Sequence, residues 1–366
     1  GSLHQGMSVA LFETGPAEHS YLLMIIHHLA IDSVSWRILL EDLEQLYLQI
    51  SNGQPIQLPP KTTSYKYWAE QLTQYAQSGD LQKELPFWLE RQKEKISSLP
   101  VDYPQGMNSN TEATADRIAT SLDVEKTRIL LKEVPKAYQT QINDVLLTAL
   151  AQALCQWTGG STQLIDLEGH GREAILDDMD LLRTVGWFTA IFPVLLSLDV
   201  TGNAGDRLKS IKEQLRRIPN RGIGYGLLRY LNKNTAIVKK LQILPEADLR
   251  FNYMGQFDLL LSSTSPFKLS NFPCGPTRSL RSNRRHLLEI EGMIVEGQLH
   301  IAWNYSRNIH HQTTIEKLAR NFMEALEELI RHCQSPTAGG FTPSDFPEAN
   351  LSQEELDDLM SEISEL

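Results

Sequence analysis

The segment from residue 163 to residue 173 places a carboxylate where it could act as a base. An apolar strand is expected to end at Leu167, and Glu168 follows it at once. Gly169 and Gly171 lack a Cβ, so the backbone there can turn sharply and come close to a molecule that Glu168 contacts. A carboxylate at the end of a strand, beside two glycines, is typical of a base that points into a cleft. A surface turn of charged residues is the alternative, and the segment alone favours neither.

A histidine pair earlier in the chain could supply the other half of a proton-transfer site. A strand is predicted from Tyr21 to Ala30, and it contains His27 and His28. Side chains on a strand alternate between its faces, so only one of the two imidazoles can face a given cleft. The strand is apolar almost throughout, and we therefore expect it to be covered on both faces. Helical spacing then predicts a helix over residues 34–49, with Asp32 or Ser33 placed to cap its start.

Composition restricts the class of protein. The chain has 366 residues, of which 41% are hydrophobic and 22% charged, as in a soluble globular protein with a sizeable core. Its formal net charge of −11 argues against nucleic acid or an anionic membrane as a partner. The three cysteines are scattered without metal-ligand spacing, which fits a cytoplasmic protein and predicts no metal site. The longest apolar run, Tyr21 to Ile26, is too short to span a bilayer.

Periodicity and turn residues predict the elements that must hold these groups. Helices are predicted over residues 64–95 (with Trp68 and Trp88 on apolar faces), 123–134, 141–157, 207–217 and 313–331. Strands are predicted over residues 9–13, 185–196 and 251–256, and as a hairpin of 287–295 with 298–305 around Glu296-Gly297. Residues 100–115 are rich in Pro, Gly, Asn and Thr, which predicts a linker or flexible loop and a lobe boundary.

Two glycine-rich stretches could be interpreted as an attachment site for a prosthetic group and as a phosphate-binding loop. Gly159-Gly160-Ser161 resembles a serine that carries a phosphopantetheine arm, but its place between a helix and a strand favours a plain turn. Gly222, Gly224 and Gly226 are not a phosphate loop, because the lysine of that motif is missing. They suit a tight backbone crossing instead.

Several motifs, in order along the chain, carry a family resemblance. His27-His28-x-x-x-Asp32-x-x-Ser35-Trp36 resembles the HHxxxD signature of the condensation superfamily of nonribosomal peptide synthetases. Glu168-Gly-His-Gly-Arg-Glu173 resembles the motif that distinguishes epimerization domains from condensation domains. Three further stretches match epimerization motifs in the right order, namely residues 183–189, 219–226 and 251–256. Residues 143–149 match a fourth motif more weakly. The resemblance covers nearly the whole chain, including residues 339–346.

This resemblance implies an α/β fold of two lobes, each similar to chloramphenicol acetyltransferase, in a V with a tunnel between them. Residues 1–115 would form the N-terminal lobe, residues 116–335 the C-terminal lobe, and residues 336–366 a linker with a docking helix. The family has a longer segment before its histidine motif, so the first lobe is expected to be shortened at its N-terminus. Ser33 stands where the family has a glycine, which costs little if its φ is negative.

The resemblance also implies a reaction. Family members invert the Cα of an aminoacyl or peptidyl thioester, from L to D, on the phosphopantetheine arm of an upstream peptidyl carrier protein. No cofactor is bound directly, because the arm arrives on the partner. His28 and Glu168 would be the acid and base on opposite faces of the planar intermediate, and Tyr253 would donate a hydrogen bond to the enolate or thioester. From the residues alone, a packed histidine, a salt-bridged carboxylate (perhaps to Arg172 or to an arginine that crosses between the lobes) and a buried tyrosine remain the alternatives.

Other residues of these motifs should support the site. Those expected to hold it together are His27, Asp32, Ser35, Trp36, His170 and Arg172, and those expected to shape the tunnel are Trp187, Phe188 and Asn252. Asp32 should pair with an arginine and fix its loop rather than touch substrate. Trp187 and Phe188 could equally belong to the core, and on a regular strand Asn252 points away from Tyr253.

Partners and competing functions follow from the same residues. A condensation domain that forms a peptide bond, or a non-catalytic module that docks a carrier protein, are the alternatives to an epimerase. Arg183 and the basic helix 207–217 could meet a carrier, or could form a solvated face. The acidic helix from residue 353 onward carries apolar residues on one side, namely Leu356, Leu359, Met360 and Ile363. It could dock a downstream synthetase or pack against its own lobe.

Overall fold

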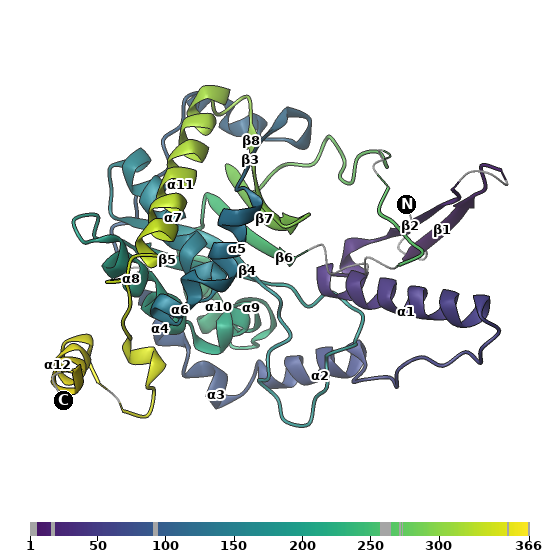
Figure 1. Ribbon diagram of the computed structural model, residues 1–366, viewed down its shortest axis with the longest axis horizontal. Helices are drawn as coiled ribbons and strands as arrows, with labels where there is room; N and C mark the ends of the chain where they lie inside the picture. Colours follow the sequence, from purple (N-terminus) through teal and green to yellow (C-terminus); the bar gives the residue numbers. More distant parts are fainter. Residues whose placement is uncertain are drawn as a thin grey trace.

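The computed structural model describes residues 6–15, 19–90, 94–256, 265–270, 272, 274–349 and 351–364. Its main body is built on a six-stranded mixed sheet in the order β3-β8-β7-β6-β4-β5 (Figure 1). These strands are β3 (Ala115–Ser121), β4 (Thr162–Gly169), β5 (Ala190–Ser197), β6 (Leu249–Gln256), β7 (Leu288–Val295) and β8 (Gln298–Ser306). Only the β4–β6 and β6–β7 pairs are parallel. The α/β class expected from the sequence is therefore confirmed.

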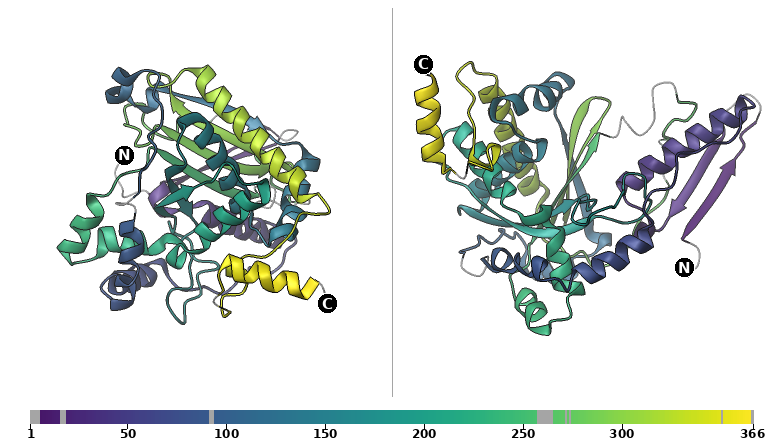
Figure 2. Two further views of the ribbon diagram at one scale, coloured as in Figure 1. Left: turned by 90° about the vertical axis from the view of Figure 1, so that its left-hand side faces the viewer. Right: turned by 90° about the horizontal axis from the view of Figure 1, so that it is seen from below.

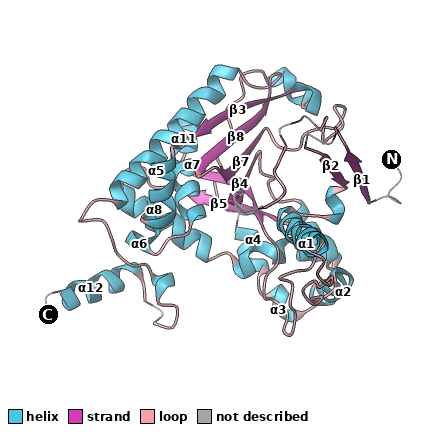
Figure 3. Ribbon diagram, turned by 45° about the vertical axis from the view of Figure 1, so that its right-hand side comes forward, coloured by secondary structure: helices cyan, strands magenta, loops and turns pink. Residues whose placement is uncertain are grey.

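One face of the sheet is covered by helices that bury the main core (Figure 3). They are α5 (Val124–Lys132), α6 (Val134–Tyr138), α7 (Ile142–Thr158), α8 (Ala204–Arg216) and α11 (Gln312–Cys333). Every residue of α7 from Asp144 to Cys155 is buried, which explains why its apolar residues show no single stripe. The helix ends at Gly159, in a left-handed conformation (φ 73°), so Gly159-Gly160-Ser161 is the plain turn that was expected.

Three cations of α8 form ion pairs within the protein. Lys212 is 1% exposed and lies 2.6 Å from a carboxylate oxygen of Asp345, while Arg216 pairs with Asp144 and Arg207 with Glu328. Each of these three cations therefore has a carboxylate partner within its own chain, and a contact of this helix with a carrier protein stays a prediction. Arg183 is likewise paired, with Glu41 and Asp42.

A second, smaller unit projects on the other side of the sheet (Figures 1 and 2). It contains the antiparallel hairpin of β1 (Met7–Phe12) with β2 (Tyr21–Ile26), and the long helix α1 (Ser33–Ser51). The expectation that this apolar strand is covered on both faces is wrong, since Tyr21, Leu22 and Ile25 are exposed. Among the described residues β2 pairs only with β1, and no second sheet or helical layer covers both of its faces.

Three short helices run back from this unit to the main body: α2 (Tyr65–Tyr75), α3 (Gly79–Gln82) and α4 (Leu85–Leu89). Trp68 and Trp88 are buried as expected, at 2% and 1% exposure, and Trp88 belongs to the same core as the six-stranded sheet. The division into lobes at residue 115 stays a prediction.

The segment 100–115 is not a flexible linker. It forms two 3-10 turns, η3 (Pro104–Ser109) and η4 (Glu112–Thr114), on the way into β3. A Cβ at Gly106 would lie 1.7 Å from the carbonyl oxygen of Asn308, and the buried Asn110 side chain donates to the carbonyls of Arg284 and His286. Turn-forming residues here serve close packing, which composition alone does not distinguish from disorder.

The chain crosses itself closely between α8 and β6. The crossing is built of η5 (Pro219–Gly222), α9 (Ile223–Gly226) and the π-helical turn η6 (Leu227–Leu231), followed by α10 (Thr235–Gln242). A Cβ on Gly222 would lie 2.2 Å from the Phe192 ring, and one on Gly224 would lie 2.0 Å from the Glu84 carboxylate. The tight crossing predicted for this stretch is confirmed at these two glycines.

At the end of the chain, the short turn η8 (Pro343–Asp345) leads to α12 (Gln353–Ser364) at the periphery of the molecule (Figures 1 and 2). Leu356 is buried at 2% exposure, so α12 packs partly on its own chain, while Leu359 is 44% exposed. No helix in the described part of the chain is both long and apolar enough to cross a membrane.

Candidate active site

A cavity of about 530 Å³ lies where the smaller unit meets the main sheet. Its wall on one side comes from the turn between β2 and α1, including His27, His28 and Leu29. The facing wall comes from the ends of β4 and β6, with Glu168, Asn252 and other residues of these strands. The cavity thus brings together the two stretches that the sequence marked as able to move a proton.

The turn that carries the histidines begins where β2 ends, at Ile26. His28 opens a single 3-10 turn, η1 (His28–Ala30), and the Nδ1 atom of its ring lies 2.8 Å from the carbonyl oxygen of Ile31. Because a carbonyl only accepts hydrogen bonds, Nδ1 must carry the proton, and in the neutral ring Nε2 keeps a free lone pair. His28 can therefore accept or, once protonated, donate a proton at Nε2.

The other histidine also lines the cavity, contrary to the alternation expected of a strand. His27 caps η1, and its Nδ1 accepts a hydrogen bond of 3.1 Å from the backbone N–H of Leu29. Alternation stops at Ile26, because the backbone then turns and no longer places successive side chains on opposite faces.

Glu168 stands at the end of β4 with both carboxylate oxygens in contact. Oε1 lies 2.8 Å from Nη1 of Arg250, and Oε2 accepts a hydrogen bond of 2.7 Å from the Asn252 side chain. Burial raises the pKa of Glu168, while the neighbouring Arg250 guanidinium lowers it and Glu291 adds to the rise. The salt bridge weighed as an alternative does exist, but its partner is Arg250 and not Arg172. Glu168 nevertheless still lines the cavity.

Asp32 fixes the start of α1, as the sequence predicted. Its carboxylate caps the helix by accepting from the backbone N–H of Ser35 at 2.7 Å, and it also accepts from the backbone N–H of Phe188 at 3.1 Å. Nη2 of Arg172 lies 3.1 Å from the same carboxylate, in a pair that is 3% and 9% exposed. The adjacent Ser33 opens the helix with ordinary right-handed geometry, so a serine is not strained there.

Arg172 also binds the loop before β5. It donates to the carbonyls of Leu181 and Thr184, and to the Ser35 hydroxyl, which itself donates to the carbonyl of Gly186. Its guanidinium lies 3.8 Å from the centre of the Phe188 ring. Arg172 and Ser35 therefore hold the turn, the helix and this loop in one arrangement.

The aromatic residues divide between wall and core. Trp187 lines the cavity, with its ring centre 5.6 Å from that of His28, whereas Phe188 is 6% exposed and packs with Trp68 in a small core of its own. Trp36 is half-buried in the first turn of α1 and does not line the cavity.

His170 sits at the cavity edge, 48% exposed, with Nε2 3.3 Å from Glu173. Its Nδ1 accepts a hydrogen bond from the backbone N–H of Arg172, which stabilises the turn after β4. Its supporting role is therefore to hold the backbone that follows Glu168.

Asn252 and Tyr253 both line the cavity, although they are neighbours on β6. The pairing of β6 with β7 shifts register between Tyr253 and Gln256, and Gly255 has a φ of 88°. Burial raises the pKa of Tyr253 to about 12, so its hydroxyl stays protonated and can donate a hydrogen bond.

A charged network behind Glu168 was not predicted from the sequence. Arg250 contacts Glu289 and Glu291 on β7, and Arg278 contacts Glu289 from the loop that precedes β7. The available signal was alternation: residues 250 and 252, like residues 289 and 291, are polar positions at intervals of two in otherwise apolar strands. That pattern marks a polar face but not its partners.

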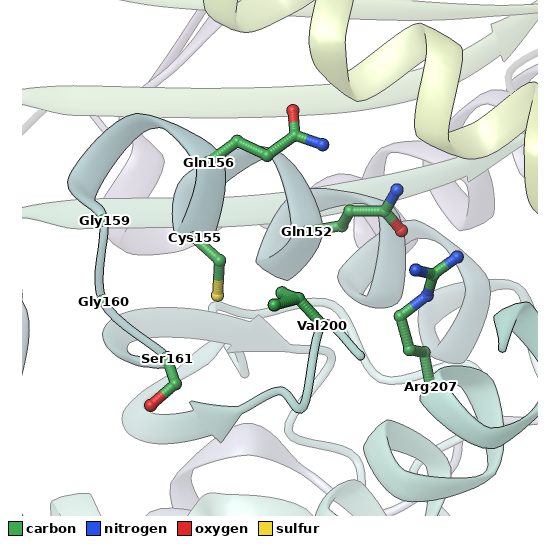
Figure 4. A pocket seen from close by; sticks show the side chains of 8 residues that line it. All are labelled: Gln152, Cys155, Gln156, Gly159, Gly160, Ser161, Val200 and Arg207. Atoms are coloured by element: carbon green, nitrogen blue, oxygen red, sulfur yellow. The ribbon is translucent and has the colours of Figure 1, made fainter. Parts of the chain in front are cut away.

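A separate cavity of about 280 Å³ lies beside the end of α7 and shares no lining residue with the first (Figure 4). It is lined by Cys155, Ser161 and Arg207, among others. Burial raises the pKa of the Cys155 thiol, which keeps it protonated and a weak nucleophile. Nothing in this cavity matches the chemistry of the histidine motif.

Comparison with known proteins defines the class to which this fold and site belong. A model of the Condensation domain family matches residues 5–352, and the chain belongs to that family. It is 49% identical over 351 residues to a linear gramicidin synthase of Brevibacillus parabrevis, covering 96% of this chain and 4% of that protein. It is 40% identical over 361 residues to bacitracin synthase 2 of Bacillus licheniformis, covering 99% of this chain and 14% of that protein. The chain thus spans a small part of these relatives.

The fold is also similar to those of solved structures. The chain is similar to the epimerization domain from the third module of tyrocidine synthetase B, with a TM-score of 0.82, 39% identity, and coverage of 90% of this chain and 72% of that chain. Its similarity to the first condensation domain of the calcium-dependent antibiotic synthetase, at 17% identity and a TM-score of 0.62, concerns the fold alone. The family and the fold implied by the sequence motifs are therefore confirmed.

Proposed function

We propose that this protein is an isomerase that epimerises the Cα of an aminoacyl or peptidyl thioester, from L to D, in nonribosomal peptide biosynthesis. The thioester would be held on the phosphopantetheine arm of an upstream peptidyl carrier protein. The observation that carries this proposal is that His28 and Glu168, far apart in the sequence, line one cavity. The likeness to an epimerization domain at 39% identity supports the same choice within the family.

The reaction needs two groups that exchange protons with Cα from opposite faces. One group takes the proton, and the electron pair of the C–H bond moves into an enolate whose charge lies on the thioester oxygen. The second group returns a proton to the other face, which inverts the centre. Nε2 of His28 and the carboxylate of Glu168 can each take or return the proton. The hydrogen bond of His28 is made by Nδ1, and the oxygens of Glu168 keep further acceptor sites. The protonated hydroxyl of Tyr253 would donate to the enolate oxygen.

Isotope exchange tests the proposal directly. In deuterated water, the wild-type protein should introduce deuterium at Cα of an aminoacyl group loaded on a carrier protein, as read by mass spectrometry. His28→Ala and Glu168→Gln should each slow this exchange by about 10²–10⁴-fold, because each removes one of the two proton carriers. Glu327→Gln, which removes a carboxylate paired with Lys126 on the helical layer, is the matched control and should exchange at the wild-type rate. Wild-type exchange in both site variants would refute the assignment.

The same assay separates the two competing functions. With loaded donor and acceptor carriers, a new peptide and no isotope exchange would indicate a condensation domain in which His28 assists the attacking amine. Carrier binding with neither product would indicate a docking module.

The terminal helix α12 is proposed to bind a downstream synthetase. Its carboxylates would face cations of the partner, and Leu359, which is 44% exposed, would contact apolar residues there. Leu359→Lys should then weaken binding of that synthetase in a pull-down with purified proteins and leave Cα exchange unchanged. Equal binding by the variant would contradict this role.

A further inference from the structure

Arg250 lies on β6 between two strands that carry carboxylates. In the sheet it is paired with Asp166 of β4 on one side and with Glu289 of β7 on the other, and its side chain is 14% exposed. Arg250 and Asn252 lie two positions apart on the same strand, so they share one of its faces. Both residues line the 530 Å³ cavity, which identifies that face as the one turned toward the histidines.

The guanidinium of Arg250 links Glu168 to β7. Nη1 lies 2.8 Å from Oε1 of Glu168, while Nη2 lies 3.1 Å from Oε2 of Glu289 and 3.7 Å from Oε1 of Glu291. A planar fork of N–H donors can hold carboxylates on two strands at once, whereas the single ammonium of a lysine cannot reproduce that geometry. Arg250 therefore ties the end of β4 to a strand with which β4 is not paired.

Asn252 holds the second oxygen of the same carboxylate, by the 2.7 Å hydrogen bond from its side chain. The plane of the Glu168 carboxylate is thus fixed from β6 at both oxygens. Each oxygen of an ionised carboxylate has a second acceptor site, so Glu168 can still take a proton. It cannot rotate about its last torsion without losing a contact.

We propose that Arg250 is a positioning residue for Glu168. The guanidinium of Arg250 holds the Glu168 carboxylate in the orientation that faces Cα of the bound thioester. This inference rests on the proposed epimerization, and Arg250 acts in it only through Glu168.

The surrounding charges give Arg250 a second effect on Glu168. Burial and the carboxylates of Glu291 and Glu289 raise the pKa of Glu168, while Arg250 and His28 lower it. Other charged or titratable groups also lie beside this cluster, namely His27, Asp32, His170, Tyr253, Arg278 and Arg284. Of these, Arg278 lies 3.7 Å from Glu289. Without Arg250, the carboxylates of Glu168, Glu289 and Glu291 would lose their shared cation, so Glu168 would keep its proton to higher pH.

Three variants test the inference. Arg250→Met removes the fork and the charge, Arg250→Lys keeps the charge alone, and Arg207→Met is a matched control that removes an arginine of similar burial, paired with Glu328 on the helical layer. The rate of Cα deuterium exchange on a loaded carrier is measured against pH. In parallel, the infrared carboxyl band that is absent in Glu168→Gln reports the titration of Glu168 itself.

Arg250→Met should lower the exchange rate by about 10²-fold, because the misplaced carboxylate no longer meets Cα. The acid limb of its pH profile and the infrared titration should both move to higher pH. Arg250→Lys should show the wild-type titration of Glu168 but a lowered exchange rate. Arg207→Met should match the wild type in both the titration and the exchange rate.

The outcomes separate this inference from the proposed function. A wild-type rate and titration in Arg250→Met would overturn the inference while epimerization stands. If the wild-type protein exchanges no Cα proton, the proposed epimerization is refuted. If the infrared titration of Glu168 is also the same in Arg250→Met as in the wild type, the effect of Arg250 on Glu168 is refuted as well. If Arg250→Met loses its native circular dichroism spectrum, Arg250→Lys decides: a full wild-type rate would overturn the inference.

Discussion

At the scale of single residues, two buried carboxylates beside arginines have different surroundings. Asp32 accepts hydrogen bonds from two backbone N–H groups as well as its contact with Arg172, and it is 3% exposed. Glu168 has one arginine and one amide, and its remaining acceptor sites face a cavity. The first carboxylate has its acceptor sites filled and holds the fold together, whereas the second keeps the open acceptor sites that the proposed proton transfer requires.

Replacing Asp32 by Ala should therefore destabilise the protein. It removes the cap of α1 and leaves the buried guanidinium of Arg172 without its counterion, so the free energy of unfolding should fall by about 3–5 kcal/mol in urea titrations. Asp80→Asn is the control, because its ion pair with Lys83 is exposed to solvent and its loss should leave the urea midpoint in place. Equal midpoints for wild type and Asp32→Ala would contradict the role of this ion pair.

The pKa of Glu168 predicts a pH dependence of stability. The folded-state pKa is raised, so between the ordinary glutamate value and the folded value the native state binds more protons than the unfolded state. Over that window the free energy of unfolding should fall as the pH rises, and it should level off above the folded pKa. Glu168→Gln removes this titration, so the stability difference between wild type and variant should change with pH in that window. A difference that is constant with pH would show that Glu168 has an ordinary pKa.

At the scale of elements, the crossing between α8 and β6 positions the strands that end at the site. Gly222 lies against Phe192 of β5, which pairs with Leu167, the residue before Glu168. The crossing thus packs directly behind the end of β4, and its geometry depends on glycines whose neighbours leave no space for a side chain.

Gly222→Ala and Gly226→Ala should have opposite consequences, although the two glycines are four residues apart. At Gly222 φ is 88° and a Cβ would lie 2.2 Å from the Phe192 ring, so alanine should cost about 1–2 kcal/mol in backbone conformation and about 1–3 kcal/mol more in overpacking. At Gly226 φ is −63° and nothing lies within 4 Å of the added Cβ. Alanine there should be neutral or stabilise by about 0.4–1 kcal/mol, as measured by thermal and urea unfolding. Similar losses in both variants would show that the crossing is not held by close contact at Gly222.

Local signals predicted much of this architecture. Asp32 capped the expected helix, and Glu296-Gly297 marked the β7–β8 hairpin, because caps and tight turns are encoded by neighbouring residues. The end of β2 was placed too late, since Leu29, Ala30 and Ile31 continue its apolar run. The turn there depends on long-range contacts, such as the hydrogen bond from the Asp32 backbone N–H to the carbonyl of Gly186.

Part of the candidate site could also be predicted from the sequence. The motif residues on the two walls of the cavity were found, but Arg250 was not, because its partners depend on β6 lying between β4 and β7. Strand order of this kind joins residues far apart in the chain, and no local pattern specifies it.

At the scale of the whole molecule, the smaller unit is attached to the main sheet mainly at its base. The ion pair of Asp32 with Arg172, and those of Glu41 and Asp42 with Arg183, join α1 to loops of the main body. The hairpin of β1 and β2 projects away from that base (Figure 2). Because the cavity lies at the junction, its shape depends on these ion pairs rather than on the hairpin.

The hairpin itself should promote self-association. Val9, Leu11 and Ile25 are 54%, 61% and 58% exposed, and they lie on a strand pair whose outer edges are free of partners among the described residues. Exposed apolar strands of this kind favour edge-to-edge pairing between molecules. The double variant Leu11→Lys/Ile25→Lys should therefore reduce concentration-dependent light scattering, without changing the urea midpoint of the main body. Ile243→Lys is the control, because Ile243 is 75% exposed but lies singly at the end of α10, and its replacement should leave the scattering as it is in the wild type. An equal reduction in both variants would attribute the association to net charge and not to the strands.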